Sequence, residues 1–565
     1  VTVNDNKNVV SFYIWDEDEW VFSERTSMAI DFSHGTIVNL SASDFDDDDT
    51  LDLFVVYQDG TNEPYQFAIY LQNYSNGVRS FPNTPIFSGD VKATSQPVLI
   101  DVNGDMLMDI LFYDGGRKVW QNPGKGNTNF IKKDFSDFSA EGCMSSNSEF
   151  ANPHSIALND FNGDCKSDLF VNSVSDDGKE EWFEYWIFDR GQYCLSCKLA
   201  LPSDYVNNHG VVSFADFDDN AIIDMAFPVF GDSPGIAISY NWHDVDRDED
   251  HLCLNRDDFV IGMNSAQCTR GSSDTKSSSK GAFVFTKLAT GSFFNTGENP
   301  SMVRIGDFNL DGYPDGLVIL QTEKNVRVNF LKSRSCDDVD CGAGDTDDRR
   351  GLTVSNDGTV EEINGYTGSI STAFFDLANL GSVDILINFR SEGISKIVGY
   401  YNNWYDDSFY LRAQGVNGDT DNSEGYYGMN FKMVATDVDA HDYMKNGIQL
   451  SQSGYTALQT PYIMFGVGRT NNYFTKFNAA APINSDDYDH EWTPIIPKSQ
   501  LIIYADGLDA SDWTLETILN PTEQAFIIML CSLSALFILG IVILCLHKVE
   551  KGENQAKQKL FYNFQ

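Results

Sequence analysis

One short acidic pattern recurs six times in this chain and constrains its fold more than any other feature. The copies begin at Asp44, Asp101, Asp160, Asp216, Asp307 and Asp376, so successive starting positions differ by 57, 59, 56, 91 and 69. In the first five copies Asp or Asn stands at positions 1, 3, 5 and 9, and position 2 is apolar. Apolar runs flank each copy, so every unit reads as strand, acidic turn, strand. A strand-rich repeat of about 60 residues predicts four-stranded blades around an axis, a β-propeller.

The spacing of the acidic residues is suited to calcium. Ca²⁺ takes six to eight oxygen ligands, and alternating residues of a tight loop can direct their oxygens to one centre. Position 9 replaces the distant Glu of an EF-hand, so no helix needs to follow. We therefore expect up to five structural calcium sites, whose ligands are Asp44, Asp46, Asp48 and Asp52; Asp101, Asn103, Asp105 and Asp109; Asp160, Asn162, Asp164 and Asp168; Asp216, Asp218, Asn220 and Asp224; and Asp307, Asn309, Asp311 and Asp315.

The copies are not equivalent, and a simpler interpretation stays open. Only the fifth has Gly at position 6, Gly312, where an EF-hand makes its sharp turn. The sixth has Ala378 and Leu380 at positions 3 and 5 and is expected to bind nothing. The alternative is that Asp and Asn only satisfy the backbone of the turns. The wide interval between the fourth and fifth copies implies an insertion, which contains the acidic run 244–250 and the Ser-rich run 271–281.

A membrane span is predicted near the C-terminus. Residues 525–546 carry no charge, and 22 residues of helix cover roughly 33 Å, enough for a bilayer. Lysines follow the span and acidic residues precede it, which predicts a type I protein with its N-terminal part outside or lumenal and residues 547–565 in the cytoplasm. That orientation requires a signal peptide, which we expect to have been removed. The net charge of −45 argues against nucleic acid as a partner.

The remaining cysteines and two sequons fit an oxidising compartment. Eight of the ten cysteines lie outside the span, an even number suited to disulfides. Cys336 with Cys341 is the easiest pair to predict, followed by Cys253 with Cys268, although eight cysteines allow 105 connectivities. Asn39 and Asn73 are predicted glycosylation sites.

The acidic repeats resemble the FG-GAP repeats of integrin α-subunit propellers. The segments "DFNGDCKSDLF" and "DFNLDGYPDGLVIL" carry the resemblance, which implies seven blades with calcium between two strands of a blade. Six motifs are present, and residues 1–30 resemble the later strands of a first blade that is truncated at its N-terminus. The predicted domains are a propeller at 1–403, a small membrane-proximal β-sandwich at 404–518, the span and the tail.

A second resemblance covers nearly the whole chain. The segments "QLSQSGYTALQTPYIMFGVGRTNNYF" and "EWTPIIPKSQLIIY", the span and the tail ending "LFYNFQ" resemble the T-cell immunomodulatory protein family, also called LINKIN. The resemblance implies a type I glycoprotein of the plasma membrane or an endomembrane that acts in cell adhesion or receptor-like binding of a protein or glycan. The short tail could recruit a cytosolic partner.

Enzyme motifs are not found. The sequence contains no GxSxG elbow, HExxH pair, Walker loop or Rossmann fingerprint. Carboxylates that hold calcium must remain ionised, which suits them poorly to proton transfer. We therefore predict no enzyme; a scaffold subunit of a larger membrane assembly is the alternative, and a calcium-dependent extracellular enzyme is less favoured.

Overall fold

The computed structural model describes most of residues 1–562. The residues outside the description are 5, 17–20, 49, 61–62, 76–77, 125–128, 243–251, 254–258, 264–265, 271–282, 290, 298, 324, 343–348, 356–362, 364, 404–407, 419–423, 437–441, 452–454, 456–458, 471–472, 520–522 and 563–565. The acidic run 244–250 and the Ser-rich run 271–281 therefore lie outside the described residues.

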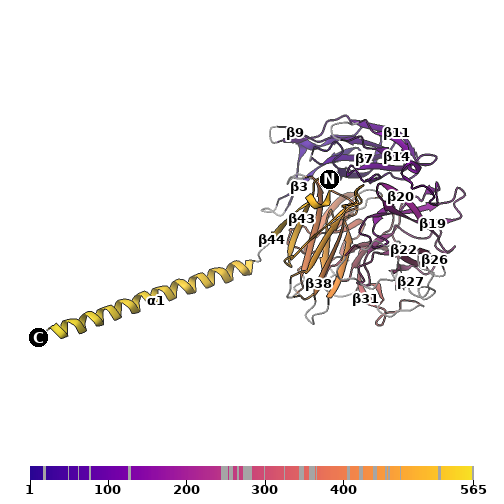
Figure 1. Ribbon diagram of the computed structural model, residues 1–565. Coiled ribbons are helices and arrows are strands. Elements are labelled where there is room, and N and C mark those ends of the chain that lie inside the picture. The colour runs from indigo at the N-terminus through magenta and orange to yellow at the C-terminus, as the bar shows by residue number, and fades with distance from the viewer. Residues whose placement is uncertain are drawn as a thin grey trace. The chain divides into compact units, whose positions relative to one another are not determined.

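Six antiparallel sheets follow one another along the chain, and each holds one acidic loop between the strand that precedes position 1 and the strand that begins at position 9. Figure 1 labels strands of the first five sheets. We number sheets and loops 1 to 6 in chain order. The strands are β6 (Thr36–Ser43), β7 (Asp52–Gln58), β8 (Tyr65–Tyr70) and β11 (Phe87–Ala93) in sheet 1; β12 (Val98–Ile100), β13 (Asp109–Tyr113), β14 (Arg117–Gln121) and β15 (Ile131–Asp134) in sheet 2; β16 (Glu149–Phe150), β17 (Ala157–Asn159), β18 (Asp168–Val174), β19 (Glu181–Asp189) and β20 (Gln192–Ala200) in sheet 3; β21 (Ser213–Ala215), β22 (Asp224–Val229), β23 (Gly235–Ser239) and β27 (Phe283–Lys287) in sheet 4; β28 (Ser292–Phe293), β29 (Arg304–Gly306), β30 (Asp315–Gln321), β31 (Val326–Ser335) and β32 (Arg350–Val354) in sheet 5; and β33 (Ser369–Phe375), β34 (Asp384–Ser391) and β35 (Ile394–Tyr400) in sheet 6.

A seventh sheet precedes these six. It consists of β1 (Thr2–Val3), β2 (Val9–Ser11) and β5 (Ile30–Asp31), with the hairpin β3 (Tyr13–Asp16) and β4 (Val21–Glu24) and the short helix η1 (Thr26–Met28) between β2 and β5. Val10 and Ile30 of this sheet pack against Val55 of β7 in one core cluster. The described strands in this region therefore belong to the propeller, as predicted for residues 1–30, and the described part of the propeller has seven sheets.

Neighbouring sheets share hydrophobic cores. The core clusters join consecutive sheets: Phe54 with Phe112, Val119 with Trp186, Phe183 with Phe227, Ile238 with Val318, and Leu317 with Ile385. The first of them also includes residues of the C-terminal part of the chain. The strands that follow loops 1 to 5 are buried on both faces along most of their length, which explains why their sequences are continuous apolar runs rather than alternating ones.

Smaller elements decorate the sheets. They are the hairpin β9 (Asn73–Ser75) with β10 (Val78–Ser80), a three-stranded sheet of β24 (Asn241–Trp242), β25 (Phe259–Met263) and β26 (Ala266–Arg270), and the short helix η2 (Phe135–Phe138). The β24–β26 sheet lies in the insertion predicted from the wide interval between the fourth and fifth copies of the acidic pattern.

A β-sandwich follows the propeller. One sheet holds β36 (Tyr410–Asn417), β37 (Glu424–Gly425), β40 (Ile463–Gly466), β43 (Ser499–Ala505) and β44 (Thr514–Leu519); the other holds β38 (Asn430–Thr436), β39 (Asp442–Ile448), β41 (Lys476–Ala480) and β42 (Asp489–Trp492), with η5 (Ala510–Asp512) before β44. Strands β36 and β43 pair in parallel. The pairs β36–β37, β36–β40, β38–β39, β38–β41 and β41–β42 are antiparallel. Propeller and sandwich belong to one compact unit, Val1–Thr517.

Strand β39 of the sandwich ends at Ile448, and the next residue pairs through its side chain. The buried side chain of Gln449 accepts a hydrogen bond from Gly415 N at 2.8 Å and donates one to Gly415 O at 3.0 Å. A side-chain amide thus takes the place of a strand backbone at this point.

The second unit, Ile518–Gln565, contains one helix, α1 (Glu523–Tyr562). Its segment Ile527–Lys559 has a mean hydropathy of 2.9 over its most apolar window and is long enough to cross a membrane. The predicted span 525–546 lies within α1, and the helix continues through most of the predicted tail.

Candidate metal centres on the loop face of the propeller

The position 9 aspartate makes the same two hydrogen bonds in every loop. In loop 2, Asp109 Oδ2 accepts from Val102 N at 3.1 Å and Oδ1 from Asn122 N at 2.7 Å. In loop 6, Asp384 accepts in the same way from Leu377 N and Asn402 N. This carboxylate therefore ties the loop to the third strand whether or not a metal is bound, which gives a physical reason for Asp at position 9 in loop 6.

The position 1 aspartate closes the turn from the start of the loop by accepting a hydrogen bond from the backbone amide of position 6. Asp101 Oδ2 accepts from the position 6 amide, Met106 N, at 2.7 Å, and Asp376 Oδ2 accepts from Gly381 N at 2.8 Å. Position 6 has a left-handed backbone even where it is not glycine, with φ of 68° at Met106 and 70° at Cys165. Such a residue costs roughly 1–2 kcal/mol. The EF-hand-like turn of loop 5 is thus shared by loops 2, 3, 4 and 6, whichever side chain stands at position 6.

Position 3 distinguishes three loops as fitting a cation. Asp46 Oδ1, Asn103 Oδ1 and Asp218 Oδ1 are buried and have no hydrogen-bond partner among the described residues. In loops 1 and 4 carboxylate oxygens also converge: Asp44, Asp46 and Asp48, and Asp216, Asp218 and Asp224, each lie within 4.8 Å of one another. Buried oxygens without a donor cost free energy unless a cation or water meets them, and hard divalent cations prefer such ligands. Loops 1, 2 and 4 therefore fit calcium.

Loops 3 and 5 lack this unpartnered oxygen. Asn162 Oδ1 accepts from Asp164 N at 3.2 Å, and Asn309 Oδ1 accepts from Asp311 N at 3.3 Å. Loop 5 has Gly312 at position 6 and so resembles an EF-hand most closely in sequence. Its position 3 oxygen nevertheless has a donor, so glycine at position 6 does not mark the loops with an unpartnered ligand oxygen.

Burial dominates the electrostatics of the loops. It raises the pKa of Asp52 and of Asp216 to about 8 and that of Asp101 to about 7, and the neighbouring carboxylates add to each shift. The pKa of Asp307 is also raised by burial and then by Asp311. Positive charge in the loops favours the ionised carboxylates, and two sources can supply it: a bound divalent cation or a basic side chain.

The sandwich contacts the loop, or the strand end beside it, in each of the six sheets that carry an acidic loop. Its contacts, from loop 1 to loop 6, are Tyr427 Oη to Ala42 O (3.2 Å), Tyr426 Oη to Asp101 Oδ2 (2.9 Å), Lys432 Nζ to Asp160 Oδ2 (2.8 Å), Lys445 Nζ to Asp219 Oδ1 (2.5 Å), Lys445 Nζ to Gly312 O (2.8 Å) and Arg412 Nη1 to Asp376 Oδ2 (3.5 Å). The loop face of the propeller is thus covered by a domain of the same chain. Loop 6, which has no ligand residue at positions 3 and 5, receives the guanidinium of Arg412.

A sandwich segment also enters the centre of the propeller. Tyr455 donates from Oη to Asn152 Oδ1 at 2.9 Å and accepts from Gln96 N at 3.2 Å, and its ring lies edge-on to His154 at 4.9 Å. Gln96 and His154 precede the innermost strands of sheets 2 and 3. A cavity of about 150 Å³ beside this segment is lined by Asp216, Asp307 and Lys445, among others.

The disulfides confirm one prediction and correct another. Cys336 pairs with Cys341 as expected. The predicted pair Cys253–Cys268 is wrong, because Cys253 is bonded to Cys165, 88 residues away in sequence, with a Cα–Cα distance of 5.2 Å. Proximity along the chain was a poor guide, since the fold brings the insertion against loop 3. Two further cysteines pair as Cys143–Cys194, and Cys197 is also disulfide-bonded.

The two sequons differ in accessibility. Asn73 is exposed on β9 and stays a predicted glycosylation site. Asn39 is 7% exposed within β6 and its amide nitrogen is buried, so the folded chain leaves no room for a glycan there.

Sequence reasoning missed the basic and phenolic groups that meet the loops. Lys432 and Arg412 are single basic residues in sandwich strands, and no local pattern marks them. Lys445 is likewise the single basic residue of its strand, β39. Their role depends on contacts with blades that lie far away in the sequence.

These observations define the class: a mostly β protein in which a seven-sheet propeller with acidic loops is capped by its own C-terminal sandwich and followed by one candidate membrane-spanning helix. A family model described as "ITFG1, C2 domain" matches residues 422–517. The human T-cell immunomodulatory protein is 25% identical over 580 residues, covering 99% of this chain and 88% of its own length. A T-cell immunomodulatory protein homolog of Plasmodium yoelii yoelii is 26% identical over 610 residues, covering 98% and 85%.

A Macaca fascicularis T-cell immunomodulatory protein is 30% identical over 286 residues, which is 47% of this chain and 89% of that protein. The chain belongs to the T-cell immunomodulatory protein family. Among solved structures, a six-bladed β-propeller lectin from a fungus covers 65% of the chain at 9% identity with a TM-score of 0.27, which supports no argument about ligands.

Proposed function

We propose that this protein is a single-pass type I cell-surface glycoprotein whose calcium-stapled propeller mediates cell adhesion or receptor-like binding of a protein or glycan. The observation that carries the proposal is the covered loop face. The chain's own sandwich meets the loop or the adjoining strand end in each of sheets 1 to 6, so the acidic loops serve the internal structure. The outer surface of the propeller is left for partners. The family, the candidate membrane helix and the lysines that follow it support this proposal and its orientation.

The burial of the loop carboxylates also weighs against catalysis. Asp101, Asp160 and Asp376 are at most 4% exposed, so a substrate would not reach them. As ligands of a structural ion they would remain ionised and hold the turn. We therefore assign the loops a stabilising role and no chemical step.

A candidate partner surface lies on the N-terminal hairpins. Ile14 and Phe22 of β3–β4 and Tyr74 of β9 are each at least 46% exposed. Strand β10 contacts η1, which follows β4, so the two hairpins are neighbours. Exposed aromatic and aliphatic side chains of this kind are typical anchors of protein interfaces.

Cell mixing tests the adhesion proposal. Cells that display the full chain should aggregate with unlabelled cells in calcium, and chelation or the double change Ile14→Ser and Tyr74→Ser should reduce aggregation. The matched control is Ile394→Ser, which is 58% exposed on β35 in sheet 6 and should leave aggregation intact. Stable partners recovered only from the same membrane, with no aggregation between cells, would instead support the scaffold alternative.

Calcium removal tests the staples. We expect chelation to lower the melting temperature of the full chain in detergent, because one site at a hundredfold excess of calcium over its Kd contributes about 2.7 kcal/mol. Asn103→Ala should remove one bound ion, whereas Leu380→Ala at position 5 of loop 6, where the side chain is 62% exposed, should remove none. Absence of bound calcium together with an unchanged melting temperature would refute the staple.

A further inference from the structure

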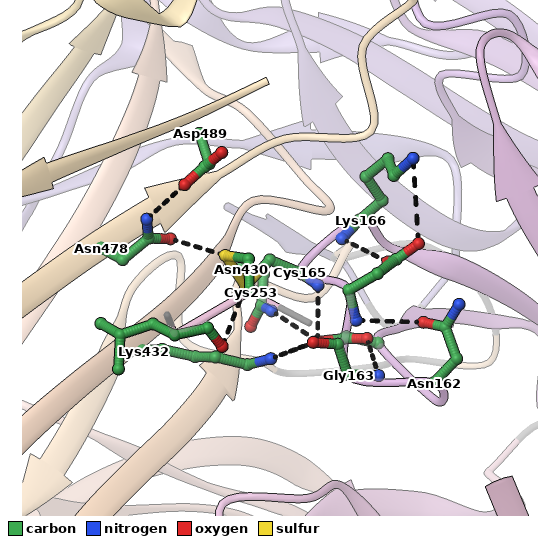
Figure 2. The surroundings of a disulfide bond; sticks show 12 residues. Asn162, Gly163, Cys165, Lys166, Cys253, Asn430, Lys432, Asn478 and Asp489 are labelled. Carbon is green, nitrogen blue, oxygen red and sulfur yellow. Dashed lines mark hydrogen bonds and ion pairs between the residues drawn. A yellow bond between two sulfur atoms is a disulfide. The ribbon is translucent and has the colours of Figure 1, made fainter. Parts of the chain in front are cut away.

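Loop 3 differs from the loops that fit calcium in having a basic side chain on its position 1 aspartate; in loop 4 the guanidinium of Arg349 pairs instead with Asp218 at position 3. Lys432 Nζ of β38 lies 2.8 Å from Asp160 Oδ2 and donates to Gly163 O at 3.0 Å (Figure 2). Both side chains of the pair are buried, 4% and 0% exposed. The equivalent contact in loop 2 is the neutral hydroxyl of Tyr426.

The other ligand oxygens of loop 3 are also engaged. Asp160 Oδ1 accepts from Gly163 N at 2.7 Å, and Oδ2 accepts from Cys165 N at 3.0 Å and Asn430 Nδ2 at 3.1 Å. Asn162 Oδ1 accepts from a backbone amide, as described above. Asp164 Oδ1 accepts from Lys166 N at 2.9 Å, and the Lys166 ammonium lies 3.8 Å from its other oxygen. Positions 1, 3 and 5 thus all have donors, whereas in loops 1, 2 and 4 one buried oxygen at position 3 has none among the described residues.

A covalent bond holds the turn that a metal would otherwise brace. Cys165 occupies position 6, and its disulfide to Cys253 anchors it to the insertion (Figure 2). The same residue donates the amide hydrogen bond that closes the loop on Asp160. Cys253 Sγ also lies 3.4 Å from Asn478 Oδ1 of β41, so loop, insertion and sandwich meet at this bond.

These contacts serve the purpose of a bound cation. A buried carboxylate needs positive charge or several donors, and Asp160 has both. A divalent ion on the same carboxylate would be repelled by the ammonium group of Lys432. This side chain is only 4% exposed, so it is held at the carboxylate by the packing around β38. In loop 6 a basic side chain likewise stands in the place of a metal ion: Arg412 lies against Asp376, and positions 3 and 5 have no ligand residue.

We propose that Lys432 is the resident cation of loop 3, so that lysine and the Cys165–Cys253 disulfide hold this loop in place of calcium. The inference rests on the proposed calcium sites in loops 1, 2 and 4. Its consequence is that sheet 3 and the sandwich stay joined when calcium is withdrawn, while the loops that depend on the ion loosen.

Counting bound ions tests the proposal. Calcium bound per full-length chain in detergent is measured by equilibrium dialysis for the wild type, Asn162→Ala, Lys432→Gln and the double variant, with Asn103→Ala of loop 2 as the matched control. We expect Asn103→Ala to lose one ion and Asn162→Ala to lose none. Lys432→Gln should gain one ion, and adding Asn162→Ala should remove it again.

The outcomes are separable. Loss of one ion in Asn162→Ala alone would overturn the proposal, because calcium and Lys432 would then share the loop. A wild type without any ion would refute the calcium sites of loops 1, 2 and 4, and the role of Lys432 would then be decided by whether Lys432→Gln gains an ion. If Lys432→Gln does not fold, hydrogen exchange of the wild type decides: chelation should accelerate exchange in 101–109 and not in 160–168, and equal acceleration in both would overturn the proposal.

Discussion

The buried ion pair between Arg117 and Glu184 offers a quantitative test of how adjacent blades are joined. Arg117 of β14 in sheet 2 donates from Nη1 to Glu184 Oε2 of β19 in sheet 3 at 2.8 Å, and the two side chains are 2% and 0% exposed. Ser146, Ser173 and Trp186 also donate to this carboxylate, at 2.6, 2.7 and 3.0 Å. Glu184→Gln keeps the shape and removes the charge, which leaves the guanidinium buried without its main partner.

The ionised carboxylate of Glu184 contributes several kcal/mol to the free energy of unfolding, as both its pKa and its burial indicate. Burial by itself would raise the pKa of Glu184, but Arg117 and the hydrogen bonds lower it from 4.5 to about 2. Since one pKa unit corresponds to about 1.4 kcal/mol, the ionised form contributes about 3 kcal/mol. Breaking a buried pair by removing one partner typically costs about 3–5 kcal/mol. We therefore expect Glu184→Gln to lower the local unfolding free energy by about 3 kcal/mol at pH 7.

The pH dependence has a definite sign. Because the folded-state pKa is depressed, the contribution is complete above about 4.5 and is lost as the pH falls towards about 2. Hydrogen exchange of sheets 2 and 3 in the full chain reports local stability without assuming two-state unfolding. The difference between wild type and variant should shrink across that window, and the exposed neighbour Glu180→Gln should change stability by less than about 0.5 kcal/mol. A difference below about 1 kcal/mol at pH 7, or one that is independent of pH, would refute the reasoning.

Three further changes probe the interface and the propeller centre. Gly104→Ala should speed exchange where the sandwich meets loop 2, because a Cβ would lie 2.6 Å from Asn484 N, whereas Gly115→Ala, with a similar φ and nothing within 4 Å, should not affect that interface. Tyr455→Phe should lower stability by about 1–3 kcal/mol in a chemical denaturation series, since it leaves buried partners without a hydrogen bond; an unchanged midpoint would contradict this. Burial lowers the pKa of His154 from 6.5 to about 4, so wild-type stability should fall as the pH drops from about 6.5 to about 4, and in His154→Asn that part of the dependence should disappear.

Local periodicity was sufficient to predict the propeller. The strand that follows each acidic loop begins at its position 9 residue, as at Asp52, Asp109 and Asp384, because the apolar run and the turn chemistry both lie within one short motif. The roles of individual loop positions were less visible. Asp at position 9 was interpreted as a metal ligand, yet its two backbone hydrogen bonds explain it even in loop 6.

Contacts distant in sequence were not predictable. Nothing near Lys432 or Tyr426 indicates that these side chains meet Asp160 and Asp101, which belong to much earlier blades of the propeller. The same holds for Cys165 and Cys253, whose pairing depends on where the insertion folds. The end of β39 is equally hidden, because Gln449 pairs through its side chain, which a hydrophobic pattern does not reveal.

The parallel pairing of β36 with β43 has a mechanical consequence. The chain enters the sandwich from the propeller at β36, and β44, the strand next to β43, leads to the membrane helix. Tension between a partner held by the propeller and the bilayer would therefore cross three hydrogen-bonded strands. The hydrogen bonds of this strand ladder would then bear the load along the chain.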